Sequence, residues 1–339
     1  MFGYLRFILA CFVLASHTGI SLQGFNIGVF AVICFFMLAG YVVAELFDKF
    51  FGRDRFLYFE FYFERALRIF PQYFFVLILT IVFVSYSGFF EIDLSAVNIL
   101  SSLIILPLNW NSFLDFQTFI PPAWSLAIEL KAYLLLPFVV YFQSLKVVLA
   151  LLSVIVFLFA SLGFINTDLY SLNTIFGTFF IFVIGVSIYA STKKDDLDLF
   201  DIYFPPAIYL IMILLMIVLG VIYREMIFIA NVMEVALAII IGLPIIYFIA
   251  NKNINLPYNG IFADLSYGVF LSHFLVINVI NHYTGITFSY GINESNAHIS
   301  PVFYVVSVFI FSVLVSLIAL YLIERPIKKY RFHITKNLK

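Results

Sequence analysis

Residues 27–46 read IGVFAVICFFMLAGYVVAEL, twenty residues in which Glu45 is the only charged side chain. A helix rises about 1.5 Å per residue, so a predominantly apolar run of about 20 residues is long enough to cross a bilayer. Similar runs recur along the chain, and we place ten membrane spans. Their approximate bounds are 4–21, 25–46, 67–88, 122–142, 146–165, 171–191, 204–222, 226–250, 265–283 and 300–323.

Composition supports the same class. Of the 339 residues, 64% are hydrophobic and only 11% are charged, which is more apolar surface than a soluble core can bury. Many of the 44 Phe and 21 Tyr stand near span ends, where amphipathic rings favour the membrane interface. We therefore predict an all-α, polytopic membrane helix bundle. The net charge of −1 argues against nucleic acid as a partner.

Two segments need interpretation before the topology is read. The N-terminal MFGYLR resembles the start of a signal peptide, but it has one basic residue, no clear cleavage site and a second span close behind it. The run 94–108, LSAVNILSSLIILPL, is short, dotted with polar residues and interrupted near its end by a proline. We interpret it as a re-entrant or interfacial piece. Cys11 and Cys34 lie in apolar spans and indicate neither a disulfide framework nor a metal site.

Basic residues gather on one side of this topology. With a cytoplasmic N-terminus, the outer loops carry only Arg224, while Arg6 and Lys131 fall within spans. The other basic residues face the cytoplasm: Lys49, Arg53, Arg55, Arg65, Arg68, Lys146, Lys193, Lys194, Lys252, Arg325, Lys328, Lys329, Arg331, Lys336 and Lys339. Cytoplasmic loops are enriched in Lys and Arg, so both termini are predicted to be cytoplasmic. An eleventh span at 94–108 would put Lys146 on the wrong side.

The first span holds two residues that are costly in lipid. Arg6 and His17 are eleven residues apart in LRFILACFVLASHTG (5–19), which places them ~16 Å apart along a helix axis. One then lies near the inner membrane face and the other in the outer half of the span. Ionisable groups inside a membrane indicate a functional site by default. The alternative is an interfacial Arg anchor and a structural histidine.

Arg65 and Arg68 stand at the inner end of the third span, at i and i+3 and hence on one helix face. Two guanidinium groups there can bind a phosphate through charge-assisted hydrogen bonds. The alternative is simple anchoring on the cytoplasmic side. Glu324, at the inner end of the last span, is a candidate ion-pair partner for a basic residue.

Glu129 lies about six residues into the fourth span, which runs inward from the outer face. It therefore reaches roughly the depth of His17, and a carboxylate that orients an imidazole is the usual support for a histidine base. The alternative is a structural pair with Lys131 or an arginine.

Other polar residues favour packing. Ser266, Tyr267, Ser272 and His273 in the ninth span are typical of hydrogen bonds between helices. Gly28 and Gly40 permit close helix approach, and KKDDLDLFD (193–201) is expected to form a solvated inner turn.

Five elements in order resemble the membrane-bound acyltransferase-3 family. Arg6 and His17 are spaced as in its R/K-x10-H element, and NIGVFAVICFFMLAGYVV is similar to its second-span stretch. Arg65-Ala66-Leu67-Arg68 fits its RxxR element. WSLAIE (124–129) fits WSLxxE, and LSYGVFLSH (265–273) is similar to SYxxYLxH. Departures are Ala39 and Tyr41 for the usual Ser and Phe, Phe270 for Tyr, and Leu130, Lys131 and Ala132 after Glu129.

The resemblance implies an O-acyltransferase domain over residues 1–327, followed by a short basic cytoplasmic tail, 328–339. It implies transfer of an acyl group, above all acetyl, from cytoplasmic acyl-CoA to a hydroxyl of a bacterial surface glycan or its lipid-linked precursor, without a metal. The setting would be the bacterial cytoplasmic membrane.

The implied site has three groups of residues. His17 and Glu129 would be catalytic, Arg6, Arg65 and Arg68 would bind acyl-CoA, and Trp124, Ser125, Tyr267 and His273 would bind substrate.

Two other classes stay open on the residues alone. A secondary transporter of a small anion would also use basic intramembrane residues, but it predicts broken helices in two matching halves, and no such symmetry is visible. A polysaccharide polymerase or flippase can share this composition. We expect such a protein to carry several basic residues in large outer loops, whereas this chain has Arg224 alone.

Overall fold

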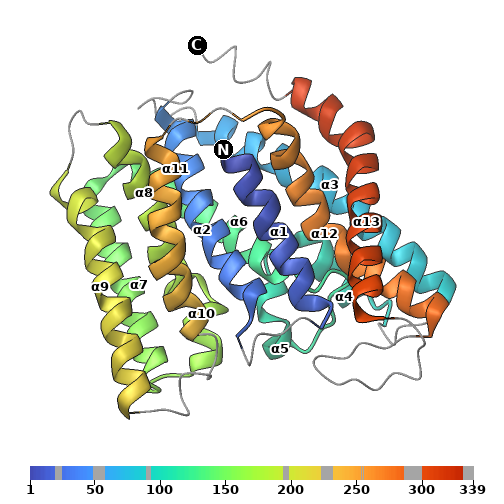
Figure 1. Ribbon diagram of the computed structural model, residues 1–339, viewed down its shortest axis with the longest axis horizontal. Helices are drawn as coiled ribbons and strands as arrows, with labels where there is room; N and C mark the ends of the chain where they lie inside the picture. The colour runs from blue at the N-terminus through green and yellow to red at the C-terminus, as the bar shows by residue number, and fades with distance from the viewer. Residues whose placement is uncertain are drawn as a thin grey trace. The chain divides into compact units, whose positions relative to one another are not determined.

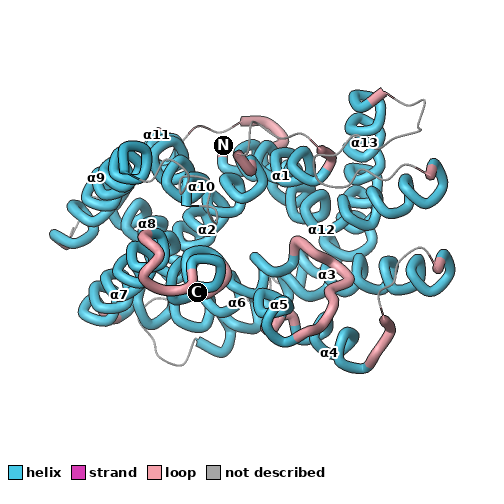
Figure 2. The backbone as a smooth tube through the Cα atoms, turned by 90° about the horizontal axis from the view of Figure 1, so that it is seen from below, coloured by secondary structure: helices cyan, strands magenta, loops and turns pink. Residues whose placement is uncertain are grey.

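The computed structural model describes residues 1–19, 25–48, 58–88, 93–193, 198–222, 232–252, 254, 256–285 and 300–330. Every regular element in these ranges is a helix, as Figures 1 and 2 show. Nine of the described helices are long and apolar enough to cross a membrane, and Phe2–His17 is a shorter apolar helix. The predicted all-α membrane bundle is confirmed. Arg224 and the tail beyond residue 330 lie outside the described residues.

The long helices are α1 (Phe2–His17), α2 (Ile27–Leu46), α3 (Tyr58–Ser87), α6 (Ala123–Tyr141), α7 (Gln143–Ser161), α8 (Ile175–Lys193), α9 (Leu199–Ile222) and α12 (Asn259–Thr284). α10 (Val232–Leu237) continues through the π-helical turn η6 (Ala238–Gly242) into α11 (Leu243–Asn251). α13 (Pro301–Ala319) continues through the π-helical turn η7 (Leu320–Glu324). Short pieces are α4 (Ala96–Ile104), η3 (Leu108–Trp110), α5 (Asn111–Leu114) and η4 (Asp168–Leu172).

The ambiguous run 94–108 is too short to span. Ser95 caps α4, which ends after nine residues at Ile104. Around it the loop is closed by polar contacts, since the Asn98 side chain donates to Asp93 O at 2.7 Å and accepts from Gln117 N at 2.9 Å. This confirms that the segment does not count as an eleventh span.

The chain divides into two compact units. One contains α1, α3, α4, α5, the start of α6, α12 and α13. In it α1 packs along α12 in the same direction, because Gly3 N donates to Asn259 Oδ1 at 2.8 Å and the His17 ring meets His273 (Figure 1). α13 runs the opposite way, since Tyr304 near its start donates to Asn281 near the end of α12. Both directions are those that the ten-span topology predicts.

The other unit contains α2, the rest of α6, and α7 to α11. Its core is the contact between α2 and α8, where backbones touch. A Cβ on Gly40 would stand 1.9 Å from Phe182 O, and a Cβ on Gly185 would stand 1.9 Å from Met37 O. Small residues allow this approach, which strengthens van der Waals packing between membrane helices. The predicted role of Gly40 is thus confirmed, and Gly185 is its counterpart on α8.

Several helices begin earlier than hydropathy predicted, and the difference is largest for α3 and α12. α3 starts at Tyr58 rather than 67, and α12 starts at Asn259 rather than 265. The extensions contain charged residues such as Glu60, Glu64 and Asp264. Hydropathy detects the part of a helix that lipid surrounds, whereas helical hydrogen bonding continues beyond it. Arg65 and Arg68 therefore lie two turns or more inside α3.

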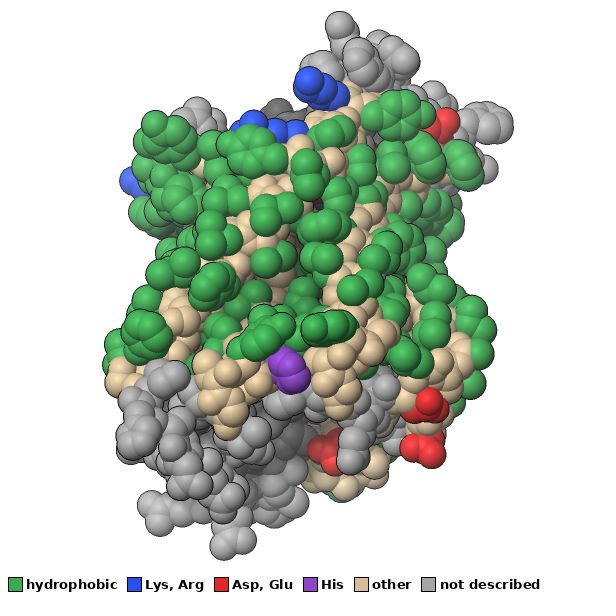
Figure 3. All heavy atoms as spheres, turned by 90° about the vertical axis from the view of Figure 1, so that its right-hand side faces the viewer, with side chains coloured by type: hydrophobic (Ala, Val, Ile, Leu, Met, Phe, Trp, Pro, Cys, Tyr) green, Lys and Arg blue, Asp and Glu red, His purple; other side chains and the backbone are tan. Residues whose placement is uncertain are grey.

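The surface of the first unit matches a membrane environment. Apolar side chains of α13 and of η7 after it are exposed, among them Val302, Phe303 and Phe311 on α13 and Leu322 on η7. Figure 3 shows this face, with hydrophobic side chains over its middle and charged side chains toward its two ends, where Lys and Arg gather at one end only. An apolar band between two charged ends is the pattern of a membrane-spanning bundle.

The orientation can be tested by cysteine labelling. Leu114 on α5 is 56% exposed, and Lys252 is exposed after α11. In a background with Cys11→Ala and Cys34→Ala, Leu114→Cys should react with a membrane-impermeant maleimide in intact spheroplasts. Lys252→Cys should react only after permeabilisation. Labelling in the reverse order would show that the termini face outward.

Candidate active site

The first unit brings His17 against a second histidine. His17 ends α1, and its ring is stacked on His273 of α12 with centroids 5.4 Å apart and planes 20° apart. The Phe274 ring meets the His17 ring edge-on, with ring centroids 4.7 Å apart. His273 is fully buried, and its Nδ1 lies 3.2 Å from Val269 O of its own helix. The parallel packing of α1 and α12 thus creates a histidine pair from residues 256 positions apart.

The two rings are held differently. The contact to Val269 O fixes the orientation of the His273 ring, and its buried Nε2 has no hydrogen-bond partner in the described part of the chain. His17 is half-buried at the end of its helix. His273 therefore supports one face of the His17 ring, and His17 is the more accessible of the two for acid–base chemistry.

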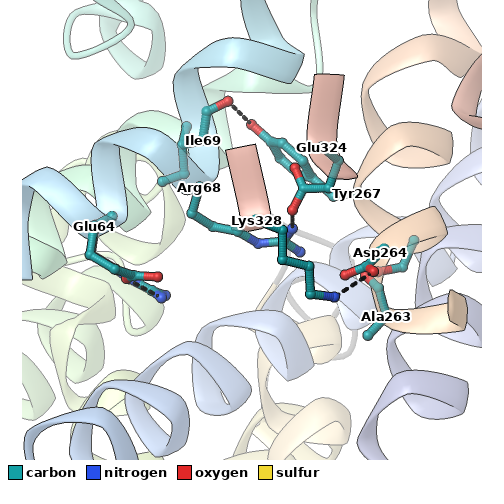
Figure 4. A network of polar contacts seen from close by, with 10 residues as sticks. Glu64, Arg68, Ile69, Ala263, Asp264, Tyr267, Glu324 and Lys328 are labelled. Atoms are coloured by element: carbon teal, nitrogen blue, oxygen red, sulfur yellow. Dashed lines mark hydrogen bonds and ion pairs between the residues drawn. The ribbon is translucent and has the colours of Figure 1, made fainter. Parts of the chain in front are cut away.

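A second cluster, the Arg68 network, lies in the first halves of α3 and α12, and Figure 4 shows it from close by. Arg68 forms an ion pair with Glu324 of η7, and its guanidinium stands 5.6 Å from the centre of the Tyr267 ring. The Tyr267 hydroxyl donates to Ile69 O at 3.0 Å. Lys328 pairs with Asp264 at 2.7 Å. The predicted pairing of Glu324 with a basic residue is confirmed.

Arg65 is also paired. Its Nε donates to Glu64 Oε2 at 2.6 Å, and both side chains are almost completely buried. A charge removed from water is costly unless an opposite charge and hydrogen bonds accompany it. Both arginines of the RxxR element are thus paired with carboxylates inside the bundle. Arg6 is half-buried near the start of α1, in the same unit.

The remaining predicted residues lie on α6. Ser125, which is buried, donates to Pro122 O at 3.0 Å, so its hydroxyl closes the first turn of the helix, and Trp124 beside it is half-buried. Glu129 accepts from the Tyr133 hydroxyl one turn along. Sequence reasoning missed Tyr133, although its i+4 spacing from Glu129 is the signal that finds such pairs. His17 and Glu129 belong to different units, and their pairing stays a prediction.

In the ninth span the expected hydrogen bonds between helices are present in part. Tyr267 bonds to α3, and Ser272 donates to Ser312 O of α13 at 3.4 Å. Ser266 instead donates within its own helix, to Ala263 O. These contacts fix the face of α12 that carries His273.

The prediction that residues 193–201 form a solvated turn is wrong at Asp201. Asp201 lies in the first turn of α9 and is only 6% exposed. Both of its carboxylate oxygens accept hydrogen bonds from Lys146 Nζ, at 2.8 and 2.7 Å. Ser187 of α8 donates to the same carboxylate at 2.7 Å. The pair joins α7, α8 and α9. Hydropathy could not separate Asp201 from Asp198, which is exposed, because only the tertiary partner distinguishes them.

Within the described ranges, no group of three or more His, Cys, Asp or Glu residues is arranged to hold a metal ion.

The helices are long and apolar enough to cross a membrane, and they enclose a histidine pair and a buried arginine network, which together define a membrane protein with an ionisable site among its helices. The profile of the acyltransferase-3 family, described as an acyltransferase domain, matches residues 2–321. The chain belongs to that family, and it is a membrane O-acyltransferase. This membership favours the enzyme over the transporter, polymerase and flippase alternatives.

Among known proteins, the chain is similar to an uncharacterized protein of Aquifex aeolicus (strain VF5). The two are 29% identical over 219 residues, which is 64% of this chain and 91% of that protein. No solved structure matches the chain.

The buried Lys146–Asp201 pair generates a stability prediction. Asp201→Asn leaves a buried ammonium without its counter-charge, and breaking such a pair costs about 3–5 kcal/mol. Thermal unfolding of the detergent-purified protein should therefore shift to lower temperature. The double variant Lys146→Met, Asp201→Leu replaces the pair with apolar groups and should recover most of the loss. An unchanged melting temperature for Asp201→Asn would show that the pair is not structurally important.

Proposed function

We propose that this protein transfers an acyl group, most simply acetyl, from acyl-CoA in the cytoplasm to a hydroxyl of a bacterial surface glycan or its lipid-linked precursor. The bacterial cytoplasmic membrane is the proposed location. The observation that carries the proposal is the arrangement along α12, where Tyr267 meets the arginine network and His273 meets His17 six residues further on. At ~1.5 Å per residue, ~9 Å of helix separates a phosphate-binding cluster from a general base.

The donor end is assigned to the arginines. Acyl-CoA carries several phosphates, and Arg65 and Arg68 approach them from α3, with Arg6 as a third positive group on α1. Each guanidinium has five N–H donors, and the printed contact of Arg68 with Glu324 uses a single nitrogen of its guanidinium. The ion pairs also orient the two side chains before the donor binds, which lowers the ordering cost of binding.

The chemistry is assigned to His17. As the acceptor oxygen attacks the acyl carbonyl, His17 takes the hydroxyl proton, and the bond between that carbonyl and the CoA sulfur breaks. Imidazole suits this role because its unperturbed pKa lies close to neutrality. Glu129 is proposed as the carboxylate that orients His17 or stabilises its cation. Trp124, Ser125, Tyr267 and His273 are proposed to bind and position the substrates.

His17→Ala should abolish acylation of the acceptor, because no base remains to take the hydroxyl proton. CoA binding should persist, since ~16 Å of helix separates His17 from Arg6. Mass spectrometry of the glycan from a deletion strain that carries each variant measures the transfer, and titration of the purified protein with CoA measures binding. Glu129→Gln should lower the rate sharply while preserving shape.

The matched control is His282→Ala, which removes an imidazole from the outer end of α12 and should leave transfer unchanged. Near-normal acylation by the His17→Ala protein would refute the mechanism.

Arg65→Ala and Arg68→Ala should each weaken CoA binding. A charge-assisted hydrogen bond contributes about 1.5–3 kcal/mol, so the loss should be roughly ten- to a hundred-fold. Lys252→Ala is the control, because it removes an exposed positive charge that lies outside the Arg68 network. Equal CoA affinity in all three variants and the wild type would reduce the arginines to structural anchors.

A further inference from the structure

One buried side chain of the first unit is not used by the mechanism above. Gln72 of α3 is 1% exposed, and within the described residues neither its Nε2 nor its Oε1 has a hydrogen-bond partner. A buried donor or acceptor left unsatisfied costs about 1–3 kcal/mol. Glutamine has no special packing value that offsets this cost, since methionine or leucine fills the same volume. An unsatisfied buried amide in a native structure calls for an explanation.

The surroundings of this amide are built to receive it. A Cβ on Gly268 of α12 would stand 2.6 Å from Gln72 Nε2 and 2.2 Å from Ser316 Oγ, so any larger residue at 268 would displace the carboxamide. Ser316 itself is satisfied, because it donates to Leu265 O at 2.9 Å. The amide thus lies against a glycine between α3, α12 and α13, with its own polar atoms unpaired.

Its position falls on the route that the proposed donor must follow. Gln72 is one turn beyond Arg68 on α3, ~6 Å further along the helix and on nearly the same face. It meets α12 at Gly268, immediately after Tyr267 of the Arg68 network and five residues before His273. The order along the bundle is therefore guanidinium, carboxamide and histidine pair.

We propose that Gln72 binds the pantetheine arm of the acyl donor, an inference that rests on the proposed use of acyl-CoA. From the phosphates outward, this arm carries a hydroxyl and then two secondary amides. A primary carboxamide donates to a carbonyl through Nε2 and accepts an N–H or O–H through Oε1, so both unsatisfied atoms find partners on one arm. With phosphates on Arg68, the hydroxyl and the first amide come nearest to Gln72. Its role is to position the arm so that the thioester reaches His17.

The test compares two probes on the purified full chain. CoA has the nucleotide and the arm, whereas adenosine 3′,5′-bisphosphate has the nucleotide end alone. Gln72→Met should weaken CoA about tenfold, which corresponds to two neutral hydrogen bonds. It should leave the affinity for adenosine 3′,5′-bisphosphate unchanged. Without ligand, its thermal stability should equal or exceed that of the wild type, because an unsatisfied amide has been replaced by an apolar group. Gln72→Leu provides a second apolar replacement.

Thr80→Val is the matched control. Thr80 is buried two turns further along α3, but its hydroxyl is satisfied by Val76 O at 2.8 Å, so CoA affinity should not change. Equal CoA affinity in the wild type and both Gln72 variants would overturn the assignment while the acyl-CoA proposal stands. Equal weakening of both probes, or a loss of stability, would show a structural role and also overturn it. A wild-type protein that binds neither probe would refute the acyl-CoA donor itself.

Discussion

The rest of this structure depends on the inability of lipid to hydrogen-bond with a polar group. Inside the bundle each charge must bring its own partner, and the described pairs show how closely this is followed. Arg65 has Glu64, Arg68 has Glu324, and Lys146 has Asp201. A minority of buried polar atoms in the described residues lack a hydrogen-bond partner, and each calls for an explanation. The unpaired polar atoms of Gln72 and His273 differ in this from the paired side chains that hold the helices together.

Under this constraint the helices of the two units are held together by different kinds of contact. In the unit of α2 and α8, glycine contacts and the buried Lys146–Asp201 ion pair hold the helices together. In the unit of α1, α3, α12 and α13, polar side chains follow α12 from Asp264 past Tyr267 to His273. One unit is built mainly from backbone-to-backbone packing, and the other presents a graded series of polar groups along a single helix.

Hydropathy and charge asymmetry were sufficient to predict the spans, because lipid imposes length and composition directly on the sequence. They also identified 94–108 as non-spanning and gave the relative directions of α1, α12 and α13. They could not find where α3 begins, since Glu60 and Glu64 end an apolar window without ending a helix. Asp201 was mistaken for a solvated acid for a related reason, because burial of a charge depends on a partner 55 residues away. The stacking of His17 on His273 likewise needs two helices from opposite ends of the chain, and a pattern within one span does not reveal it.

The pairing of α1 with α12 has a consequence for biosynthesis. Gly3 and its partner Asn259 are 256 residues apart. Ribosomes add about 5–20 residues per second, so α1 waits roughly ten to fifty seconds for the helix that covers it. During that time Arg6 and His17 are in the membrane without the neighbours they have in the finished protein. The insertion machinery or the helices made between α1 and α12 must shelter this short helix, and its slow completion makes the first segment the one most dependent on the last third of the chain.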